Sequence, residues 1–187
     1  MRRKTFDVLF ETQTGMTALV KQPCLWRSGF YYTLSVGLFT GVVTNTWLLH
    51  EPLEVRLGIV VAMIIVFGAA LAMYSFLLHG ILETFGALAG DAKGLVCLLG
   101  YTTLPFLLLT PCALLAGKMG FNGLFVLAGI TLIGCFWMLY LLVRSLEVVY
   151  IIDFYRAAAT VLFSLLLLYI AIVFPWQVGF NLLLRHI

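Results

Sequence analysis

Five long runs of apolar residues, separated by short polar segments, dominate the pattern of this sequence. Each run is close to the roughly 20 residues that a helix needs to cross a hydrocarbon core of about 30 Å. Lipid offers no partners to backbone N–H and C=O groups, so such runs predict helices, and short connections predict antiparallel neighbours. The expected fold is an all-α bundle of five transmembrane helices. The predicted spans are Phe30–Leu49, Leu57–Leu78, Gly94–Gly117, Gly123–Val143 and Ala157–Phe174.

The third run is unusual because two prolines interrupt it. Pro105 and Pro111 have no N–H, so the carbonyl group four residues before each proline loses its helical partner. Pro105 lies roughly 16 Å along the helix from the start of the run, which predicts a kink near mid-membrane. The freed carbonyls need other donors, such as nearby hydroxyls, a neighbouring helix or water. The hydroxyl residues near the kink, which are also the candidate lining of a pore or pocket, are Thr102, Thr103 and Thr110.

The distribution of basic residues predicts the direction of the spans. Cytoplasmic loops of membrane proteins carry an excess of Lys and Arg. If the five spans alternate in direction, eight of the eleven Lys and Arg residues fall on the side of the N-terminus. The sequence therefore predicts a cytoplasmic N-terminus and a C-terminus outside. The three basic residues on the opposite side are Arg56, Lys118 and Arg185.

The segment ahead of the first span, residues 1–29, has an amphipathic pattern. Apolar residues between positions 6 and 20 fall close to one helical face, with Asp7, Glu11 and Lys21 elsewhere. This pattern predicts a helix that lies along the cytoplasmic membrane surface. The alternative is a helix packed under the bundle, and both interpretations stay open. Residues 30–187 would form the membrane domain.

Composition agrees with a membrane location and narrows the function. The chain is 63% hydrophobic and 10% charged, whereas about a quarter of the residues of a soluble domain are charged. Lipid must therefore cover part of the apolar surface, and the bilayer is the first expected partner. No basic stripe suited to nucleic acid is present. The four cysteines form no Cys-x-x-Cys pair, and we expect neither a metal nor a cofactor.

The charged residues and histidines lie at or beyond the ends of the predicted spans. Intramembrane charges usually mark ion pathways or substrate sites, so this placement argues against an ion-coupled transporter. Motifs such as Gly-x-Ser-x-Gly and His-Glu-x-x-His do not occur in the sequence. We therefore expect no enzymatic activity.

One polar group follows the second span. His79 and Glu83 are spaced i, i+4 and could share a metal ion or a proton on one helix face. The favoured interpretation is a helix end whose polar groups meet water and headgroups. Asp91 and Lys93 follow before the third span. All four residues are candidates for docking a partner on the cytoplasmic face.

A second polar group connects the fourth and fifth spans. Arg144 and Glu147 are spaced i, i+3, as are Asp153 and Arg156. Helical spacing of this kind predicts two ion pairs in a cytoplasmic patch. The same patch is a candidate docking surface for a partner protein.

Small residues at four-residue spacing predict close helix packing. Gly37 and Gly41 lie on the first span, and Gly68 and Ala72 lie on the second. Such faces let helices approach closely. Packing within the chain is the expected use, and a homo-oligomer contact is the alternative.

The third run also resembles the signature of a known family. Gly100, Tyr101, Leu104 and Pro105 form a Gly-Tyr-x-x-Leu-Pro pattern, with Pro111 following. This pattern is similar to the third-span motif of the Yip-domain family, integral membrane proteins named after the Ypt-interacting proteins. A glycine-containing polar connection precedes the motif and a tryptophan-containing span follows it, so the resemblance covers nearly the whole chain. It implies five spans with a cytoplasmic N-terminus.

The chain departs from eukaryotic members of that family. It has no long hydrophilic N-terminal region, and the segment before the second span reads His50-Glu-Pro-Leu-Glu54 where those members carry Asp-Leu-x-Gly-Pro. The shorter form resembles prokaryotic members, so Rab binding and vesicle traffic are not expected. The expected location is the cytoplasmic membrane of a prokaryote.

Two kinds of function fit these observations. The first is a non-enzymatic scaffold or adaptor whose cytoplasmic face contacts a partner protein or anionic lipid. The second is a small permease, channel or lipid-handling protein that uses the kinked third span. A polar cavity beside Pro105 would favour a transport path, and a lateral opening between helices would favour lipid handling.

Overall fold

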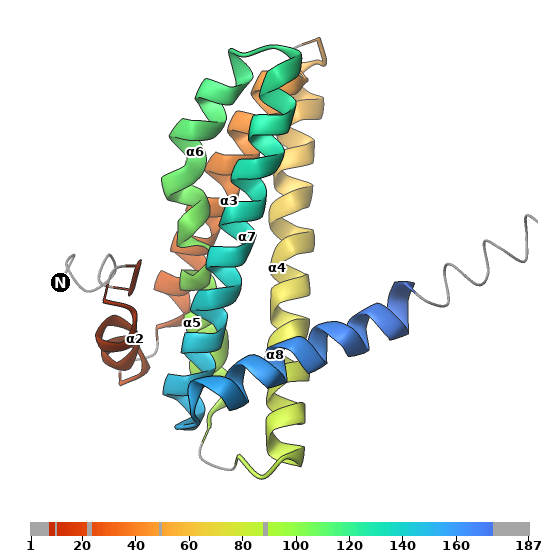
Figure 1. The fold of residues 1–187 in the computed structure, drawn as a ribbon. Helices are drawn as coiled ribbons and strands as arrows, with labels where there is room; N and C mark the ends of the chain where they lie inside the picture. Colours follow the sequence, from red (N-terminus) through yellow and green to blue (C-terminus); the bar gives the residue numbers. More distant parts are fainter. Residues whose placement is uncertain (1–7, 10, 22–23, 49, 88–89, 174–187) are drawn as a thin grey trace, which may run out of the picture.

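The computed structural model describes residues 8–9, 11–21, 24–48, 50–87 and 90–173 (Figure 1). Every regular element within these ranges is a helix. The elements are α2 (Thr12–Val20), α3 (Leu25–Trp47), α4 (Leu53–Thr84), α5 (Ala92–Thr102), α6 (Leu104–Gly117), α7 (Phe121–Tyr150), α8 (Phe154–Leu168) and the π-helical η1 (Tyr169–Val173).

Four helical stretches of the described chain are long and apolar enough to cross a membrane. They are Leu53–Thr84, Ala92–Gly117, Phe121–Tyr150 and Phe154–Ala171. The first predicted span falls in α3, which has 23 residues and packs between α4 and α6. Hydroxyl and glycine residues make α3 more polar than the other long helices, so composition alone does not place it among the four. These helices confirm a multi-span, all-helical membrane protein.

The long helices run up and down beside one another (Figure 1). α3 and the α5–α6 pair run in one direction, and α4 and α7 run in the other. α3 packs against α4 and α6, and α6 packs against α7, which gives the lateral order α4, α3, α6, α7. α5 lies lower in the bundle, where it contacts α3, α4 and α7.

α4 and α7 are longer than the predicted spans. They contain 32 and 30 residues, which correspond to roughly 48 Å and 45 Å. A hydrocarbon core of about 30 Å does not cover such lengths. Both helices continue through their polar residues, so His79, Glu83, Arg144 and Glu147 lie on helical ends that project beyond the apolar spans.

α8 differs from the expected antiparallel arrangement, because it runs crosswise to the bundle (Figure 1). α7 ends at Ile151, whose left-handed backbone turns the chain before α8 begins. α8 then crosses α4, where the hydroxyl groups of Tyr74 and Ser164 lie 2.7 Å apart and the rings of Phe85 and Phe163 have centroids 6.2 Å apart. The predicted end of this span at residue 174 lies outside the described residues.

α2 also lies crosswise, on the opposite side of the bundle (Figure 1). It packs against α5 and α7, and Met16 is fully buried there. Ser145 Oγ, which donates to the Leu141 carbonyl, lies 3.6 Å from Met16 Sδ, and Gln13 Nε2 donates to Glu147 Oε1 at 3.4 Å. Of the two alternatives, these contacts favour a helix packed on the bundle. Part of the predicted apolar face, with Asp7 and the leading basic residues, lies outside the described residues.

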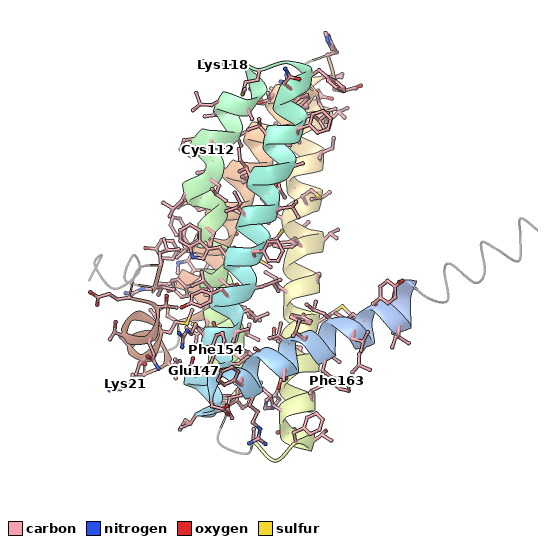
Figure 2. All side chains as sticks on the ribbon, in the orientation of Figure 1. Lys21, Cys112, Lys118, Glu147, Phe154 and Phe163 are labelled. Atoms are coloured by element: carbon pink, nitrogen blue, oxygen red, sulfur yellow. The ribbon has the colours of Figure 1, made fainter. Side chains whose placement is uncertain are left out.

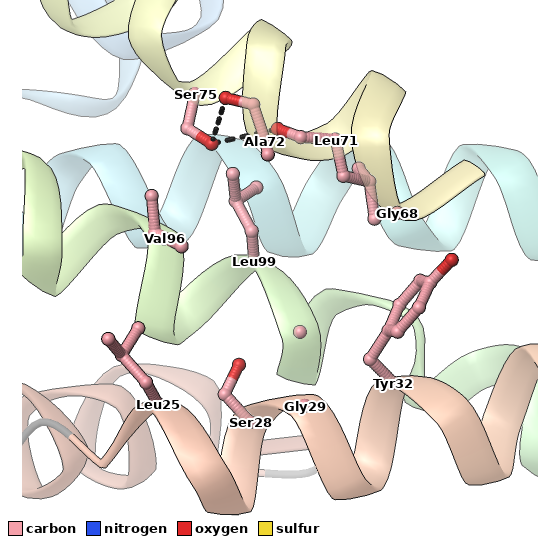
Figure 3. Close-up of a pocket in the computed structure, with 11 residues that line it drawn as sticks. Leu25, Ser28, Gly29, Tyr32, Gly68, Leu71, Ala72, Ser75, Val96 and Leu99 are labelled. Carbon is pink, nitrogen blue, oxygen red and sulfur yellow. Dashed lines mark hydrogen bonds between the residues drawn. The ribbon is translucent and has the colours of Figure 1, made fainter. Parts of the chain in front are cut away.

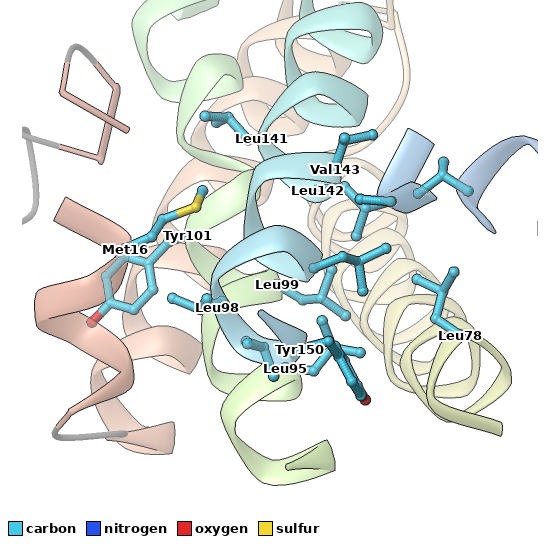
Figure 4. Close-up of a cluster of buried hydrophobic side chains, with 14 of the residues drawn as sticks. Met16, Leu78, Leu95, Leu98, Leu99, Tyr101, Leu141, Leu142, Val143 and Tyr150 are labelled. Carbon is cyan, nitrogen blue, oxygen red and sulfur yellow. The ribbon is translucent and has the colours of Figure 1, made fainter. Parts of the chain in front are cut away.

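The main core lies at the level of α2 and α8 (Figure 4). We call this the crossing end of the bundle, defined by residues 78–87, 90–98 and 141–156. Its centre is a set of fully buried apolar side chains from α4, α5 and α7, namely Leu78, Leu82, Leu95, Leu98, Leu141 and Leu146. Away from this end, α4 exposes most of its apolar surface, as expected of a helix that lipid covers.

Ile151 provides a test of the turn between α7 and α8. Its φ of 54° is unfavourable for a β-branched residue, and its side chain is 82% exposed. Ile151→Gly should stabilise the fold by about 1 kcal/mol, because relief of strain exceeds the added backbone entropy of the unfolded chain. The thermal unfolding midpoint in detergent should rise.

The control for this prediction is Ile152→Gly. Ile151 is the only described non-glycine residue with a positive φ, and Ile152 is partly buried against the core. Glycine at position 152 should therefore lower the midpoint. A lower midpoint for Ile151→Gly as well would contradict the account of strain.

Candidate functional site

The predicted third span consists of two helices rather than one smoothly kinked helix. α5 ends at Thr102, Thr103 joins the two helices, and α6 begins at Leu104. Pro105 therefore occupies the first turn of α6, where a helix has no partner for the missing N–H in any case. Pro111 lies inside α6 with its side chain exposed.

The threonine hydroxyls at the break satisfy the end of α5. Thr102 Oγ1 donates to the Leu99 carbonyl at 2.7 Å, and Thr103 Oγ1 donates to the Gly100 carbonyl at 2.8 Å. Both threonines are fully buried. The last carbonyls of a helix lack intrahelical partners, and in lipid each unsatisfied group costs several kcal/mol. These hydroxyls therefore close the helix end, and neither is available to a passing solute.

Thr110 is used in a similar way inside α6. Its Oγ1 donates to the Phe106 carbonyl at 2.8 Å. The three threonines predicted as pore or pocket lining are thus all engaged with their own helices. The two cavities described below lie beside the break but are lined by other residues.

Gly100 and Tyr101 hold α5 against α3. A Cβ atom at Gly100 would lie 2.6 Å from the Ser28 carbonyl oxygen, so only glycine permits this approach. The buried ring of Tyr101 packs against Tyr31, with centroids 5.4 Å apart. Leu104 is also buried. The family-like motif is therefore a packing device that fixes α5, the break and the start of α6.

A small cavity of about 150 Å³ lies between α3, α4 and α5, beside Gly100 (Figure 3). Two of its hydroxyl groups are already bonded: Ser75 Oγ donates to the Leu71 carbonyl at 2.7 Å, and Tyr32 Oη donates to the Ile64 carbonyl at 2.5 Å. The volume is below the roughly 300–1,000 Å³ of typical ligand sites. This cavity is therefore a packing gap.

A larger cavity of about 370 Å³ lies on the other side of the break. We call it the lateral groove. Phe106, the residue after Pro105, contributes to its wall, and Thr40 and Thr131 are the hydroxyl residues in its lining. The remaining lining is apolar or sulfur-containing: Val36, Phe39, Val43, Met63, Phe67, Leu127, Cys135 and Met138. A cavity next to Pro105 thus exists, but its lining suits an apolar ligand rather than a polar one.

The His79 group ties helices together at the crossing end. His79 Nδ1 lies 2.5 Å from the Tyr150 hydroxyl, and its Nε2 lies 3.3 Å from Glu83 Oε1. These contacts join α4 to the end of α7. Asp91 caps α5 by accepting from the Lys93 backbone N–H at 3.0 Å. The described residues contain no group of three or more His, Cys, Asp or Glu placed to hold a metal ion.

The Arg144 group joins α2, α7 and α8. Arg144 Nη1 lies 2.7 Å from Glu147 Oε2, and its Nε donates to the Tyr140 hydroxyl at 3.1 Å. The guanidinium also lies 5.0 Å from the ring centre of Phe154, at the start of α8 (Figure 2). With the contact from Gln13 to Glu147, one ion pair links three helices.

The predicted pair of Asp153 with Arg156 is not formed. Arg156 Nη2 instead donates to the Phe85 carbonyl at 2.6 Å, which fastens α8 to the end of α4. Asp153 is the exposed N-cap residue of α8 and has an extended backbone. The i, i+3 rule applies when both residues are helical, so this pairing was wrong.

Sequence reasoning also missed the lateral groove, whose apolar lining gave no signal distinct from ordinary packing.

These features define an all-helical, multi-pass membrane protein in which the candidate span Ala92–Gly117 is divided at Thr103. The model of the Yip1 domain matches residues 6–174, nearly the whole chain. The chain therefore belongs to the Yip1 domain family, which confirms the resemblance seen in the Gly-Tyr-x-x-Leu-Pro pattern. Comparison with curated proteins and with solved structures gave no match.

Gly100 allows a direct test of the contact between α3 and α5. Gly100→Ala should destabilise the fold by about 1–3 kcal/mol, because its methyl group would push α5 away from the Ser28 carbonyl. The measurement is the unfolding midpoint in detergent.

The matched control is Gly94→Ala on the same helix. A Cβ at Gly94 would meet no atom within 4 Å, so alanine should be neutral or stabilise by about 0.5–1 kcal/mol. Equal losses at both positions would show that general helix effects, rather than the close approach, explain the result.

Proposed function

We propose that this protein is a non-enzymatic membrane scaffold or adaptor that docks a partner protein through its crossing end. The observation that carries the proposal is that contacts between distant elements hold the crossing end together, while apolar side chains stay exposed on its surface. Lys93, Arg144 and Arg156, three basic residues of the predicted cytoplasmic side, lie at this end, so the partner would be cytoplasmic.

Rigidity of the crossing end comes from contacts between elements distant in sequence. Arg156 binds the Phe85 carbonyl, His79 contacts Tyr150, and Gln13 contacts Glu147. These contacts fasten α8, α7 and α2 to their neighbours. The charged residues predicted to dock a partner thus largely hold the surface in place.

Apolar side chains at the same end are available to a partner. Ile151 and Tyr155 are each 82% exposed, and Phe85 is 56% exposed. The Phe85 ring packs against Phe163 of α8, with centroids 6.2 Å apart, and the Tyr155 ring packs against Phe154. A fixed surface with exposed apolar and aromatic residues is typical of a protein interaction site.

A transport path is the weaker alternative. The buried threonine hydroxyls at the break bond their own helix, and the neighbouring lateral groove is largely apolar. An ion or polar solute would find few partners along such a surface. The absence of recognisable catalytic motifs from the sequence supports the non-enzymatic part of the proposal.

The proposed topology has five spans in the cytoplasmic membrane of a prokaryote, with the N-terminus inside and the C-terminus outside. The distribution of Lys and Arg supports this direction. α3 counts as the first span because it packs between α4 and α6. The fifth span rests on the length and composition of residues 154–171.

Reporter fusions at residue 187 test the topology. A C-terminus outside should give an active alkaline phosphatase fusion and a dark green-fluorescent-protein fusion, because each reporter folds on one side only. The same fusions after residue 87, in the connection from α4 to α5, should give the opposite result. Fluorescence at residue 187 would mean that α8 stays on the cytoplasmic side, in keeping with its crosswise direction.

Site-specific photo-crosslinking tests the docking surface. A photoreactive residue at Tyr155 should yield one protein adduct of defined mass in native membranes. The same residue at Phe125, which is 67% exposed on α7 away from the crossing end, should yield lipid adducts. Lipid adducts alone at position 155 would contradict a docking role, and an adduct of twice the chain mass would identify the homo-oligomer alternative.

A further inference from the structure

The lateral groove lies between α4 and α7, which do not pack against each other along it. α4 packs on α3, α5 and α8, whereas α7 packs on α2, α5, α6 and α8. Above the break, α6 contacts α3 and α7, so no helix fills the space between α4 and α7. α3 and Phe106 of α6 form the floor of the groove, and α4 and α7 form its walls. The opening therefore faces laterally, toward the hydrocarbon.

The size and lining of the groove fit an acyl chain. Its volume of about 370 Å³ falls within the roughly 300–1,000 Å³ of typical ligand sites. Nine of the eleven lining residues are apolar or sulfur-containing. At this depth in a bilayer the surrounding medium consists of lipid chains, so a chain enters without crossing water.

Two buried donors without partners lie beyond one end of the groove. Among the described residues, the buried side-chain nitrogen or oxygen atoms without a hydrogen bond are Trp47 Nε1 and Arg56 Nε. Each unsatisfied donor costs about 1–3 kcal/mol, more for a charged group. They lie where α3 ends and α4 begins, at the end of the bundle opposite α8.

Helical register connects both donors to the groove. Trp47 follows the lining residues Thr40 and Val43 at spacings of seven and four residues along α3. Arg56 precedes the lining residues Met63 and Phe67 at spacings of seven and eleven along α4. Residues at these spacings share one helical face. The faces that line the groove therefore continue to the two unpaired donors.

Arg56 is held in place by α3. Its Nη1 donates to Asn45 Oδ1 at 2.5 Å, which leaves the Nε–H for another acceptor. Glu51 and Glu54 lie close to Arg56 in the sequence and are exposed, but neither of them forms an ion pair with Arg56. A phosphate is the acceptor best suited to a guanidinium and an indole N–H, because its oxygens are charged and carry no competing donors.

We propose that the lateral groove binds one phospholipid, with an acyl chain between α4 and α7 and the phosphate accepting hydrogen bonds from Arg56 Nε and Trp47 Nε1. The site lies opposite the proposed docking surface and is independent of it. The phosphate satisfies the two donors that the chain leaves unpaired. Glu51 and Glu54 lie on the same side of the membrane and favour a headgroup that also carries an amine.

Native mass spectrometry of the delipidated full chain tests this proposal. The probes are dioleoyl phosphatidylethanolamine, dioleoyl phosphatidylglycerol and dioleoylglycerol, which has the chains but no phosphate. We expect one bound phospholipid per chain, at least tenfold tighter binding than dioleoylglycerol, and tighter binding of the ethanolamine lipid than of the glycerol lipid. Equal binding of all three would overturn the phosphate contact.

Two conservative variants test the donors. Trp47→Phe keeps a ring without the N–H, and Arg56→Lys keeps the charge without the Nε donor. Each should weaken phospholipid binding about tenfold and leave dioleoylglycerol binding unchanged, as expected for a hydrogen bond to a charged group. Trp47→Phe should also raise the unfolding midpoint of the lipid-free protein, because it removes a buried unpaired donor. Unchanged phospholipid binding by both variants would overturn the proposal.

A groove-filling variant tests the position of the chain. Leu127→Trp places a large ring in the groove, and Leu124→Trp, one turn away on an exposed part of α7, is the control. Leu127→Trp should abolish binding of both classes of lipid, and Leu124→Trp should not. Bound phospholipid should also slow alkylation of Cys135, which lines the groove, and leave exposed Cys112 unchanged. Equal protection of both thiols would indicate bulk lipid only and overturn a defined site.

Discussion

Where α5 ends, the carbonyl groups of its last turn have lost their helical partners, and lipid offers none in return. Thr102 and Thr103 donate to two of these carbonyls, so α5 can end at mid-length of the span Ala92–Gly117 without leaving those two unpaired. The break changes the neighbours of the span: α5 packs on α3, α4 and α7, whereas α6 packs on α3 and α7. The core at the crossing end and the opening above it both follow from this shift.

Gly100 also makes this arrangement possible. α5 has to lie close to α3 in order to fit between α4 and α7, and a side chain at position 100 would meet the Ser28 backbone. The Gly-Tyr-x-x-Leu-Pro pattern therefore combines a close approach, a buried ring, two hydroxyl caps and a proline in the first turn of the next helix. Each part serves the packing of α5 and α6 or the pairing of their backbone groups.

The sequence predicted the helical class, the family and the position of the break, because these depend on apolar runs and on Pro105. It underestimated α4 and α7, since a hydropathy boundary falls at the first polar residues, whereas the helices continue through His79 and Arg144. The crosswise direction of α8 depends on the backbone of Ile151, which residue type alone does not indicate. The lateral groove was not predictable, because Phe106 and Met63 have the same apolar character whether they meet lipid or another helix.

The two ends of the bundle satisfy their polar groups in different ways. At the crossing end, Arg144 and His79 find partners within the chain, and the helices are joined there by several independent contacts. At the opposite end, Trp47 and Arg56 each retain a buried donor that the described chain does not satisfy. Both donors continue faces that line an opening toward lipid, and the proposed phospholipid would supply the missing acceptor. On this reasoning the bilayer supplies one component of the folded structure, and the free energy of that end depends on the lipid that occupies it.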